Sequence, residues 1–224
     1  MPHEFDRFAA SYDDTLKASL PAGMDEDGYF AAYKVKLAAA ATRGRDVRRV
    51  LDFGCGAGRS LEYLIAEFPR AQISGFDPSA ESIRMAAERF HGATLSCDWQ
   101  QIRAQRYDVV FAANVFHHIA HEQMSAWLGR CREVLAPGGA LFVFEHNPHN
   151  PVTRRVFERC PFDVDAHMIA RPLLIENARA AGLDVAATRY TLFFPKPLKF
   201  FRPLERWLGW LPIGAQYCVE FAAR

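Results

Sequence analysis

The chain has 224 residues, of which 50% are hydrophobic and 24% are charged, a balance typical of one folded globular domain. Its 27 Lys and Arg residues nearly cancel its 26 Asp and Glu residues, so the overall charge argues against a nucleic-acid partner. The five cysteines are widely spaced and form no C-x-x-C pair, which argues against a disulfide framework or a zinc ribbon and favours a cytoplasmic location.

Two helices are predicted near the start of the chain, over residues 5–16 and 28–44, with a loop containing Pro and Gly between them. From residue 47 onward, apolar runs of strand length alternate with amphipathic stretches of helix length. The predicted strands are 47–53, 72–76, 93–97, 107–113, 140–146, 184–194 and 215–223. The predicted helices among them are 59–68, 79–90, 122–136 and 171–183.

This alternation predicts an α/β fold with a Rossmann-like, doubly wound sheet and helices on both faces. The sheet should have seven strands, mainly parallel, with an antiparallel edge strand. Antiparallel pairing is expected of the last two strands, because a Pro- and aromatic-rich insert joins them. We expect residues 1–224 to form a single domain.

The first predicted strand ends in LDFGCGAG, which places Gly54, Gly56 and Gly58 in a strand-to-helix turn. Glycine permits a positive φ and lets a ligand approach the backbone closely. The spacing G-x-G-x-G, with Arg59 where a third glycine would stand, departs from the dinucleotide fingerprint G-x-G-x-x-G. Asp52 beside the loop disfavours a phosphate; it either orders the turn or meets an ammonium or sulfonium group.

Two more acids follow the next two predicted strands. Asp77 can accept two hydrogen bonds from a ribose diol. Asp98 can accept from an adenine amino group, while Trp99 offers a flat apolar surface. Three strand ends therefore present groups suited to an amino-acid moiety, a ribose and an adenine.

In this order and spacing, the residues resemble the class I S-adenosylmethionine-dependent methyltransferases. LDFGCGAG is similar to motif I of that family, GFDPS to its ribose-binding loop, CDW to its adenine-binding loop, YDVVFAANVFHHI to its fourth-strand motif, and LAPGGALFVFE to its run into strand five. The resemblance covers about residues 45–145. It is close to the small-molecule branch, methyltransferase type 11/12-like, that includes quinone methyltransferases.

The resemblance implies S-adenosylmethionine as cofactor and S-adenosylhomocysteine as product. It divides the chain into an N-terminal helical cap (1–44), a cofactor-binding core (45–145) and an acceptor-side segment (146–224). The implied cofactor-binding residues are Asp52, Gly54, Cys55, Gly56, Gly58, Asp77, Pro78, Asp98, Trp99 and Asn114.

Two of the implied cofactor contacts have plainer alternatives. Asn114 would meet the methionine amino group through its backbone carbonyl, and the alternative is an ordinary turn residue. Tyr12 would reach the methionine carboxylate from a helix that closes over the cofactor. Its alternative is an aromatic residue of an amphipathic helix.

The candidate catalytic residues follow predicted strands four and five. His117 or His118 could act as a general base, since histidine titrates near neutral pH; the alternative is a capping or packing role. Glu145 and His146 end an apolar strand, where they would touch the acceptor or act as base. A base is needed only if the acceptor carries a proton with a high pKa, because positioning and desolvation can supply most of the acceleration.

No metal site is expected. His117 and His121, and likewise His146 and His149, have spacings that would permit one. The metal-dependent members of the superfamily use acid-rich sites, however, and this segment lacks acids.

The insert KPLKFFRPLERWLGWLP, near 196–212, places Phe201, Leu204, Leu208 and Leu211 at helical spacing and predicts a basic, aromatic amphipathic helix. Such a helix can lie in a membrane interface, here through residues 198–211, or receive a greasy acceptor. The alternative is packing over the sheet edge or in a dimer interface.

These patterns predict methyl transfer to a small or lipid-like acceptor by in-line displacement, at an O, N or C atom that is left open. Another S-adenosylmethionine-using transferase, such as an aminopropyl transferase, is an alternative. So is a non-catalytic module that binds the cofactor or a membrane. A nicotinamide oxidoreductase is the weakest, because the glycine spacing differs. We expect a cytoplasmic protein, with peripheral membrane contact as the alternative.

Overall fold

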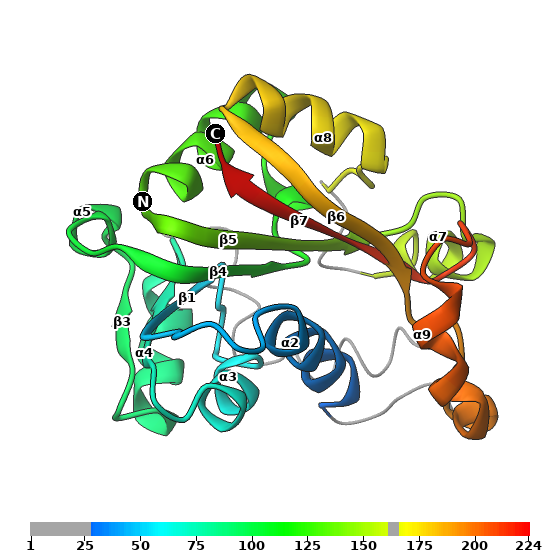
Figure 1. Cartoon of the computed structure of the whole chain (residues 1–224), viewed down its shortest axis with the longest axis horizontal. Coiled ribbons are helices and arrows are strands. Elements are labelled where there is room, and N and C mark those ends of the chain that lie inside the picture. Colours follow the sequence, from blue (N-terminus) through cyan, green and yellow to red (C-terminus); the bar gives the residue numbers. More distant parts are fainter. Residues whose placement is uncertain (1–27, 161–165) are drawn as a thin grey trace.

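The computed structural model describes residues 28–160 and 166–224. Seven strands form one sheet in the order β3-β2-β1-β4-β5-β7-β6 (Figure 1). The strands are β1 (Arg49–Phe53), β2 (Gln72–Phe76), β3 (Thr94–Ser96), β4 (Tyr107–Ala113), β5 (Leu135–His146), β6 (Leu183–Thr191) and β7 (Gln216–Ala223).

The predicted seven-stranded, mainly parallel sheet is confirmed. β1 pairs in parallel with β2 and β4, β3 pairs with β2, and β5 pairs with β4. β7 runs antiparallel to both β5 and β6. The antiparallel strand therefore lies second from the edge, and the outermost strand β6 runs in the same direction as β1 to β5.

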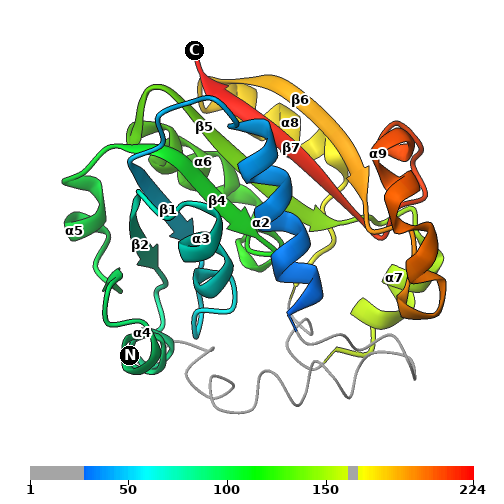
Figure 2. The same ribbon diagram turned by 60° about the horizontal axis from the view of Figure 1, so that its bottom comes forward.

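Helices cover both faces of the sheet (Figures 1 and 2). One face holds α2 (Tyr29–Ala41), α3 (Leu61–Glu67) and α4 (Ala80–Arg89). The other holds α5 (Trp99–Arg103), α6 (His121–Glu133) and α8 (Arg171–Ala180). The remaining short helices, η3 (Phe116–His118), α7 (Pro151–Phe157), η5 (Lys196–Leu204) and α9 (Glu205–Leu208), follow the carboxyl ends of β4, β5 and β6.

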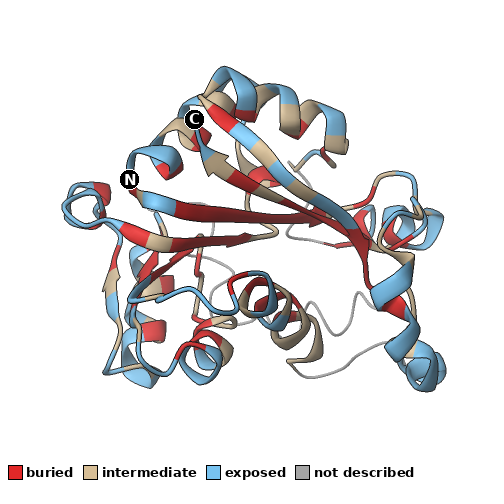
Figure 3. Cartoon of the chain, viewed as in Figure 1, coloured by how far each residue is buried: buried red, intermediate tan, exposed pale blue. Residues whose placement is uncertain are grey.

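The central strands are buried on both faces, as Figure 3 shows. Along β5, Phe142 and Phe144 pack in the cluster under α2 and α3, whereas Leu141 and Val143 pack in the cluster under α6 and α8. This is why β4 and β5 read as continuous apolar runs rather than as alternating ones. Burial of each such side chain contributes about 2 kcal/mol.

Two short helices were not predicted. α5 and α7 are only five and seven residues long, too short to show a helical period. Each begins at a capping side chain: Asp98 Oδ1 accepts from the Gln100 N–H, and Asn150 Oδ1 accepts from the Thr153 N–H.

The prediction of one amphipathic helix over the insert is wrong. Lys196–Leu204 is a 3₁₀ helix with a break at Leu198 (φ −107°), and α9 adds a single α-helical turn. Pro203 lies inside the 3₁₀ helix, and a proline removes a backbone donor and opposes a continuous α-helix.

The predicted helix over 5–16, with Tyr12, lies outside the described residues. None of the helices in the described part of the chain has the length and hydropathy that crossing a membrane would require.

Candidate functional site

The site lies at the carboxyl edge of the sheet, where β1 and β4 are neighbours. The chain proceeds from β1 to β2 and β3 on one side, and from β4 to β5 on the other. In doubly wound sheets the ligand crevice forms where the strand order reverses in this way. Within the described residues, the ends of β1 to β5 and the loops that follow them hold the cofactor and catalytic residues that the sequence singled out.

The glycine loop after β1 has three positive φ angles, 74° at Gly54, 50° at Gly56 and 90° at Gly58. A Cβ added at Gly54 would lie 2.4 Å from Val115 Cγ2, and one at Gly58 would lie 2.6 Å from Phe90. A Cβ at Gly56 would meet nothing within 4 Å. Gly54 and Gly58 therefore serve packing, whereas the open space at Gly56 suits a ligand against the backbone.

Asp77 fastens this loop to the end of β2. Its Oδ2 accepts from the Gly56 N–H at 2.9 Å, and its Oδ1 accepts from the Ser79 N–H at 2.9 Å. A carboxylate has about four lone-pair positions, so it can accept from several donors at once, and a ligand hydroxyl is one such donor. The Asp77 carboxylate therefore fixes the position of the glycine loop and lies directly next to it.

Asp52 is buried beneath the loop, and its Oδ2 meets no hydrogen-bond donor in the described residues. Burial, followed by the charge of Asp77, raises the pKa of this carboxyl to about 8, while the ammonium of Lys34 opposes the shift. A buried, unpartnered carboxylate oxygen is costly unless a cation or donor meets it. Of the two predicted roles, the position fits meeting a cationic group.

Lys34 was missed by the sequence analysis. It lies on α2, is only 5% exposed, and has its pKa lowered to about 8 by burial and by Arg59, against the attraction of Glu145 and Asp52. The signal was available: Lys34 falls on the same helical face as Ala31, Val35 and Ala38, which are buried. This places a cation near both Asp52 and Glu145.

Asn114 is held in the left-handed region at φ 59°, directly after β4. Its N–H donates to the Phe144 carbonyl, and its Oδ1 is buried with no bonding partner in the part of the chain that the structure describes. A non-glycine residue in this conformation is uncommon and often marks a functional turn.

The other predicted cofactor residues differ in exposure. Asp98 is exposed and caps α5, and Pro78 is exposed beside Asp77. Cys55 is buried, and burial raises the pKa of its thiol well above the usual value, so the thiol stays protonated. Trp99 is only 9% exposed and packs in the core cluster with Phe76, at 5.1 Å between ring centroids. Protein therefore covers most of the flat surface expected to face an adenine.

Glu145 connects the ends of β4 and β5. Its Oε1 accepts from the N–H groups of Val115 (3.1 Å) and Phe116 (2.7 Å), and its Oε2 lies 2.6 Å from His117 Nδ1. Burial alone would raise the pKa of this carboxyl, but His117 and the backbone donor outweigh it and the pKa is lowered. An ionised carboxylate only accepts, so Nδ1 of His117 carries the proton and Nε2 is the basic nitrogen.

Two further imidazoles and an aromatic ring gather around this pair. The His117 ring centroid lies 4.1 Å from that of His118 and 5.2 Å from that of His146. Phe157 of α7 packs edge-on against both His117 and His146, at 5.6 Å. Within residues 28–160 and 166–224, no three His, Cys, Asp or Glu side chains converge as a metal site.

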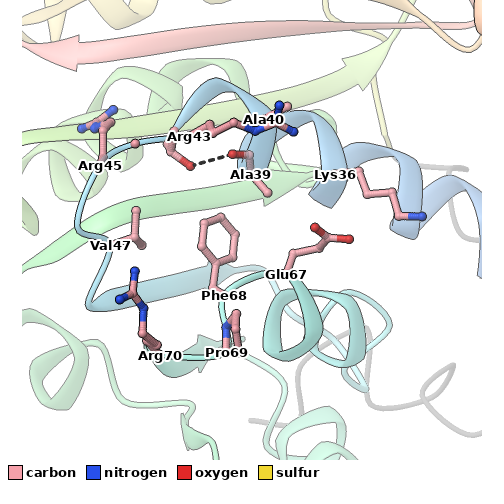
Figure 4. A pocket seen from close by; sticks show the side chains of 12 residues that line it. Lys36, Ala39, Ala40, Arg43, Arg45, Val47, Glu67, Phe68, Pro69 and Arg70 are labelled. Carbon is pink, nitrogen blue, oxygen red and sulfur yellow. Dashed lines mark hydrogen bonds between the residues drawn. The ribbon is translucent and has the colours of Figure 1, made fainter.

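A cavity of about 570 Å³ lies at the opposite, amino-terminal edge of β1 (Figure 4). It is lined by Lys36 of α2, by Arg43 just after that helix, and by Phe68 and Arg70 after α3. None of the predicted site residues lines it, so this cavity is separate from the candidate site.

The comparisons with known proteins agree with this geometry. A family described as "Methyltransferase domain" matches residues 51–141, the stretch from β1 to β5. Over residues 51–141 the chain is therefore similar to a methyltransferase domain. The fold around that domain is the Rossmann-like fold of class I methyltransferases.

Curated relatives of the methyltransferase domain act on small molecules, by their names. The chain is 34% identical over 169 residues to a trans-aconitate 2-methyltransferase of Rhodopseudomonas palustris (strain BisA53), covering 71% of this chain and 57% of the relative. It is 38% identical over 103 residues to a ubiquinone biosynthesis O-methyltransferase of Bradyrhizobium sp. (strain ORS 278), covering 42% and 38%. The chain thus spans little more than half, or less, of these relatives' length.

Solved structures of other proteins have the same fold over nearly the whole length of this chain, at low sequence identity. A TehB-like SAM-dependent methyltransferase from Corynebacterium glutamicum superposes with a TM-score of 0.65 at 18% identity, covering 98% of both chains. Magnesium protoporphyrin IX methyltransferase from Synechocystis superposes with a TM-score of 0.63 at 17% identity, covering 98% and 97%. The likeness therefore extends beyond the methyltransferase domain into the C-terminal strands.

The two kinds of glycine in the loop should respond differently to alanine. Gly54→Ala should lower the free energy of unfolding by about 3 kcal/mol, because its Cβ meets Val115 and φ is positive. Gly56→Ala should cost only about 1 kcal/mol, from backbone strain alone. Urea unfolding of both variants measures this, and equal losses would contradict the assignment.

Asp52→Asn should raise the free energy of unfolding at pH 8 by about 2 kcal/mol and change it little at pH 4. The pKa of Asp52 is raised from 3.8 to about 8, so its protonated form stabilises the fold at low pH, and this contribution is lost as the pH rises to about 8. Urea unfolding of both proteins across this range measures the difference, with Glu122→Gln, an exposed acid of α6, as control.

Proposed function

We propose that the chain transfers a methyl group from S-adenosylmethionine to a small acceptor. Residues 51–141 match the methyltransferase family, and the named relatives support a small-molecule acceptor. The observation that carries the proposal is Asp52: a buried carboxylate oxygen without a partner among the described residues, next to a glycine loop with open space at Gly56. An ammonium group, such as that of the methionine moiety, satisfies such an oxygen.

The remaining cofactor contacts follow from the neighbouring strand ends. Asp77, at the end of β2 beside Gly56, would accept from the ribose hydroxyls. Asn114 offers its backbone and a buried Oδ1, and it directly precedes Val115, which packs against Gly54. Asp98 would accept from the adenine amino group at the end of β3. When bound, S-adenosylmethionine supplies a methyl group on its sulfonium sulfur. The acceptor would attack this methyl group in line with the carbon–sulfur bond, and S-adenosylhomocysteine would be the leaving group.

His117 is the general base of the proposal, and Glu145 positions it. The Glu145 carboxylate holds the Nδ1 proton of His117, which makes Nε2 the atom that takes a proton from the acceptor. A base of this kind suits a hydroxyl acceptor, whose proton has a high pKa, so we assign an oxygen nucleophile. The name of the ubiquinone biosynthesis O-methyltransferase relatives supports this assignment. His118 and His146 flank the acceptor.

Cofactor affinity should rise with pH if Asp52 meets the ammonium. Its raised pKa keeps the carboxyl protonated near pH 6, and an ammonium partner requires the ionised form, so binding releases a proton. Calorimetric titration with S-adenosylmethionine should show affinity rising up to about tenfold per pH unit between about pH 6 and 7.5. Asp52→Asn should bind more weakly and without this slope; a slope that persists in the variant would contradict the role of Asp52.

Glu145→Gln should lower kcat about a hundredfold while leaving the affinity for S-adenosylmethionine within about twofold. The glutamine amide would donate to His117 Nδ1 and so leave the proton on Nε2, the wrong tautomer for a base. His117→Ala should lose at least as much activity.

His121→Ala, an exposed histidine at the start of α6, is the matched control and should keep full activity. The measurement is formation of S-adenosylhomocysteine with a panel of phenols and polycarboxylates. Unchanged turnover in both His117→Ala and Glu145→Gln would leave positioning alone as the mechanism. Absence of S-adenosylmethionine binding would overturn the proposed function itself.

A further inference from the structure

Large apolar side chains are exposed mainly in one stretch, residues 196–213, which we name the aromatic-basic segment. Nine large hydrophobic side chains are exposed in the described part of the chain, and seven of them belong to this segment. They are Leu198, Phe200, Phe201, Leu204, Trp207, Trp210 and Ile213. Trp210 and Phe200 are 75% and 67% exposed. Apolar surface concentrated in this way marks an interaction site.

The exposed charged side chains of the aromatic-basic segment are all positive. Lys196, Lys199 and Arg206 are exposed, Arg202 is half-buried, and the one acid, Glu205, is buried. Figures 1 and 2 show α7 beside α9, and the stretch from Asn150 to Arg159 adds three more arginines against one glutamate. The two stretches hold seven of the 27 Lys and Arg residues but two of the 26 Asp and Glu residues. A chain that is nearly neutral overall is therefore strongly basic at this end.

The aromatic-basic segment is fixed to the rest of the protein by its polar groups. The buried Glu205 carboxylate accepts from the backbone N–H groups of Phe193 and Phe194, and Arg202 lies 3.6 Å from the Tyr29 ring of α2. Asn147 donates to the carbonyls of Pro212 and Gly214, and Asn150 donates to that of Ile213. The apolar side chains are thus held outward while the backbone is anchored.

We propose that the aromatic-basic segment binds the surface of an anionic lipid bilayer. Tryptophan and other apolar side chains enter the boundary between headgroups and acyl chains, while Lys and Arg meet anionic headgroups. The segment protrudes beyond the carboxyl ends of β5 and β6 (Figure 1), a shape that a deformable lipid surface can accept. The charge complementarity selects anionic lipid over neutral lipid.

A second copy of the chain fits the aromatic-basic segment less well. In a symmetric dimer the same patch meets itself, so the exposed cations Lys199 and Arg206 would meet a surface of the same sign. Like charges brought together at an interface cost several kcal/mol. A bilayer with anionic headgroups satisfies the same cations instead.

Lipid binding here would bring the acceptor side of the candidate site to the bilayer. Asn147 directly follows His146, and it bonds the end of the aromatic-basic segment. The edge that holds His117 and His146 would then lie near the headgroups, where an amphiphilic acceptor gathers. This consequence rests on the proposed function, whereas lipid binding itself does not.

Co-sedimentation with vesicles tests the proposal on the full chain. Vesicles of phosphatidylcholine alone are compared with vesicles that contain about one third phosphatidylglycerol. We expect binding to the anionic vesicles, weakening with salt, and little binding to the neutral ones. A blue shift of tryptophan emission should accompany binding, because Trp207 and Trp210 are exposed, whereas Trp99 lies in the core cluster and Trp127 packs against it.

Two double variants assign the binding to the aromatic-basic segment. Trp207→Ser with Trp210→Ser should weaken vesicle binding at least tenfold. Lys199→Gln with Arg206→Gln should weaken it about thirtyfold, at about fivefold for each cation. Ile65→Ser and Arg70→Gln, exposed residues on and after α3, are the matched controls and should bind as the unaltered chain does.

Three results would overturn the proposal. They are no binding of the unaltered chain to anionic vesicles, equal binding by the double variants, and a dimer in sedimentation that the tryptophan variants dissociate. Thermal melting and S-adenosylmethionine titration of each variant show that the fold is retained. Because vesicle binding is measured without turnover, failure here is distinguishable from failure of the proposed methyl transfer.

Discussion

β1 to β5 all run in one direction, so the loops that follow them open at the same edge of the sheet. β1 and β4 are neighbours in the sheet. From β1 the chain continues to β2 and β3 on one side, and from β4 it continues to β5 on the other, so the loops that follow β1 and β4 lie next to each other. Their loops fit only because Gly54 has no side chain, since Val115 occupies the space where a Cβ would be. Every group assigned to the cofactor or the acceptor is placed relative to this contact.

Much of this arrangement could be predicted from local sequence. The strands are short apolar runs between amphipathic stretches, and their turns contain glycines or acids whose spacing is visible in the chain itself. Asp52, Asp77 and Asn114 could be singled out because each directly follows or ends a strand. The fold and the motifs made of residues close together in the sequence could therefore be predicted.

Features that depend on contacts between residues far apart in the sequence could not be predicted. His117 and His118 are adjacent in sequence, and only the contact with Glu145, 28 residues away, separates their roles. From its position after the third strand, Trp99 was expected to offer a flat surface to a ligand, but its ring packs in the core against Phe76. The insert has an apolar period that suggested one helix, but its prolines interrupt that helix, and the apolar side chains are left on the surface.

The Glu145 carboxylate binds the backbone after Asn114 through one oxygen and His117 through the other. The turn assigned to the cofactor and the imidazole assigned to the acceptor in the proposed function therefore share a single anchor. New acceptors would then be accommodated by altering α7 and the insert, which lie downstream of this anchor. Under the proposed function, transfer geometry and substrate choice would therefore be encoded in separate parts of the chain, so evolution could change one without rebuilding the other.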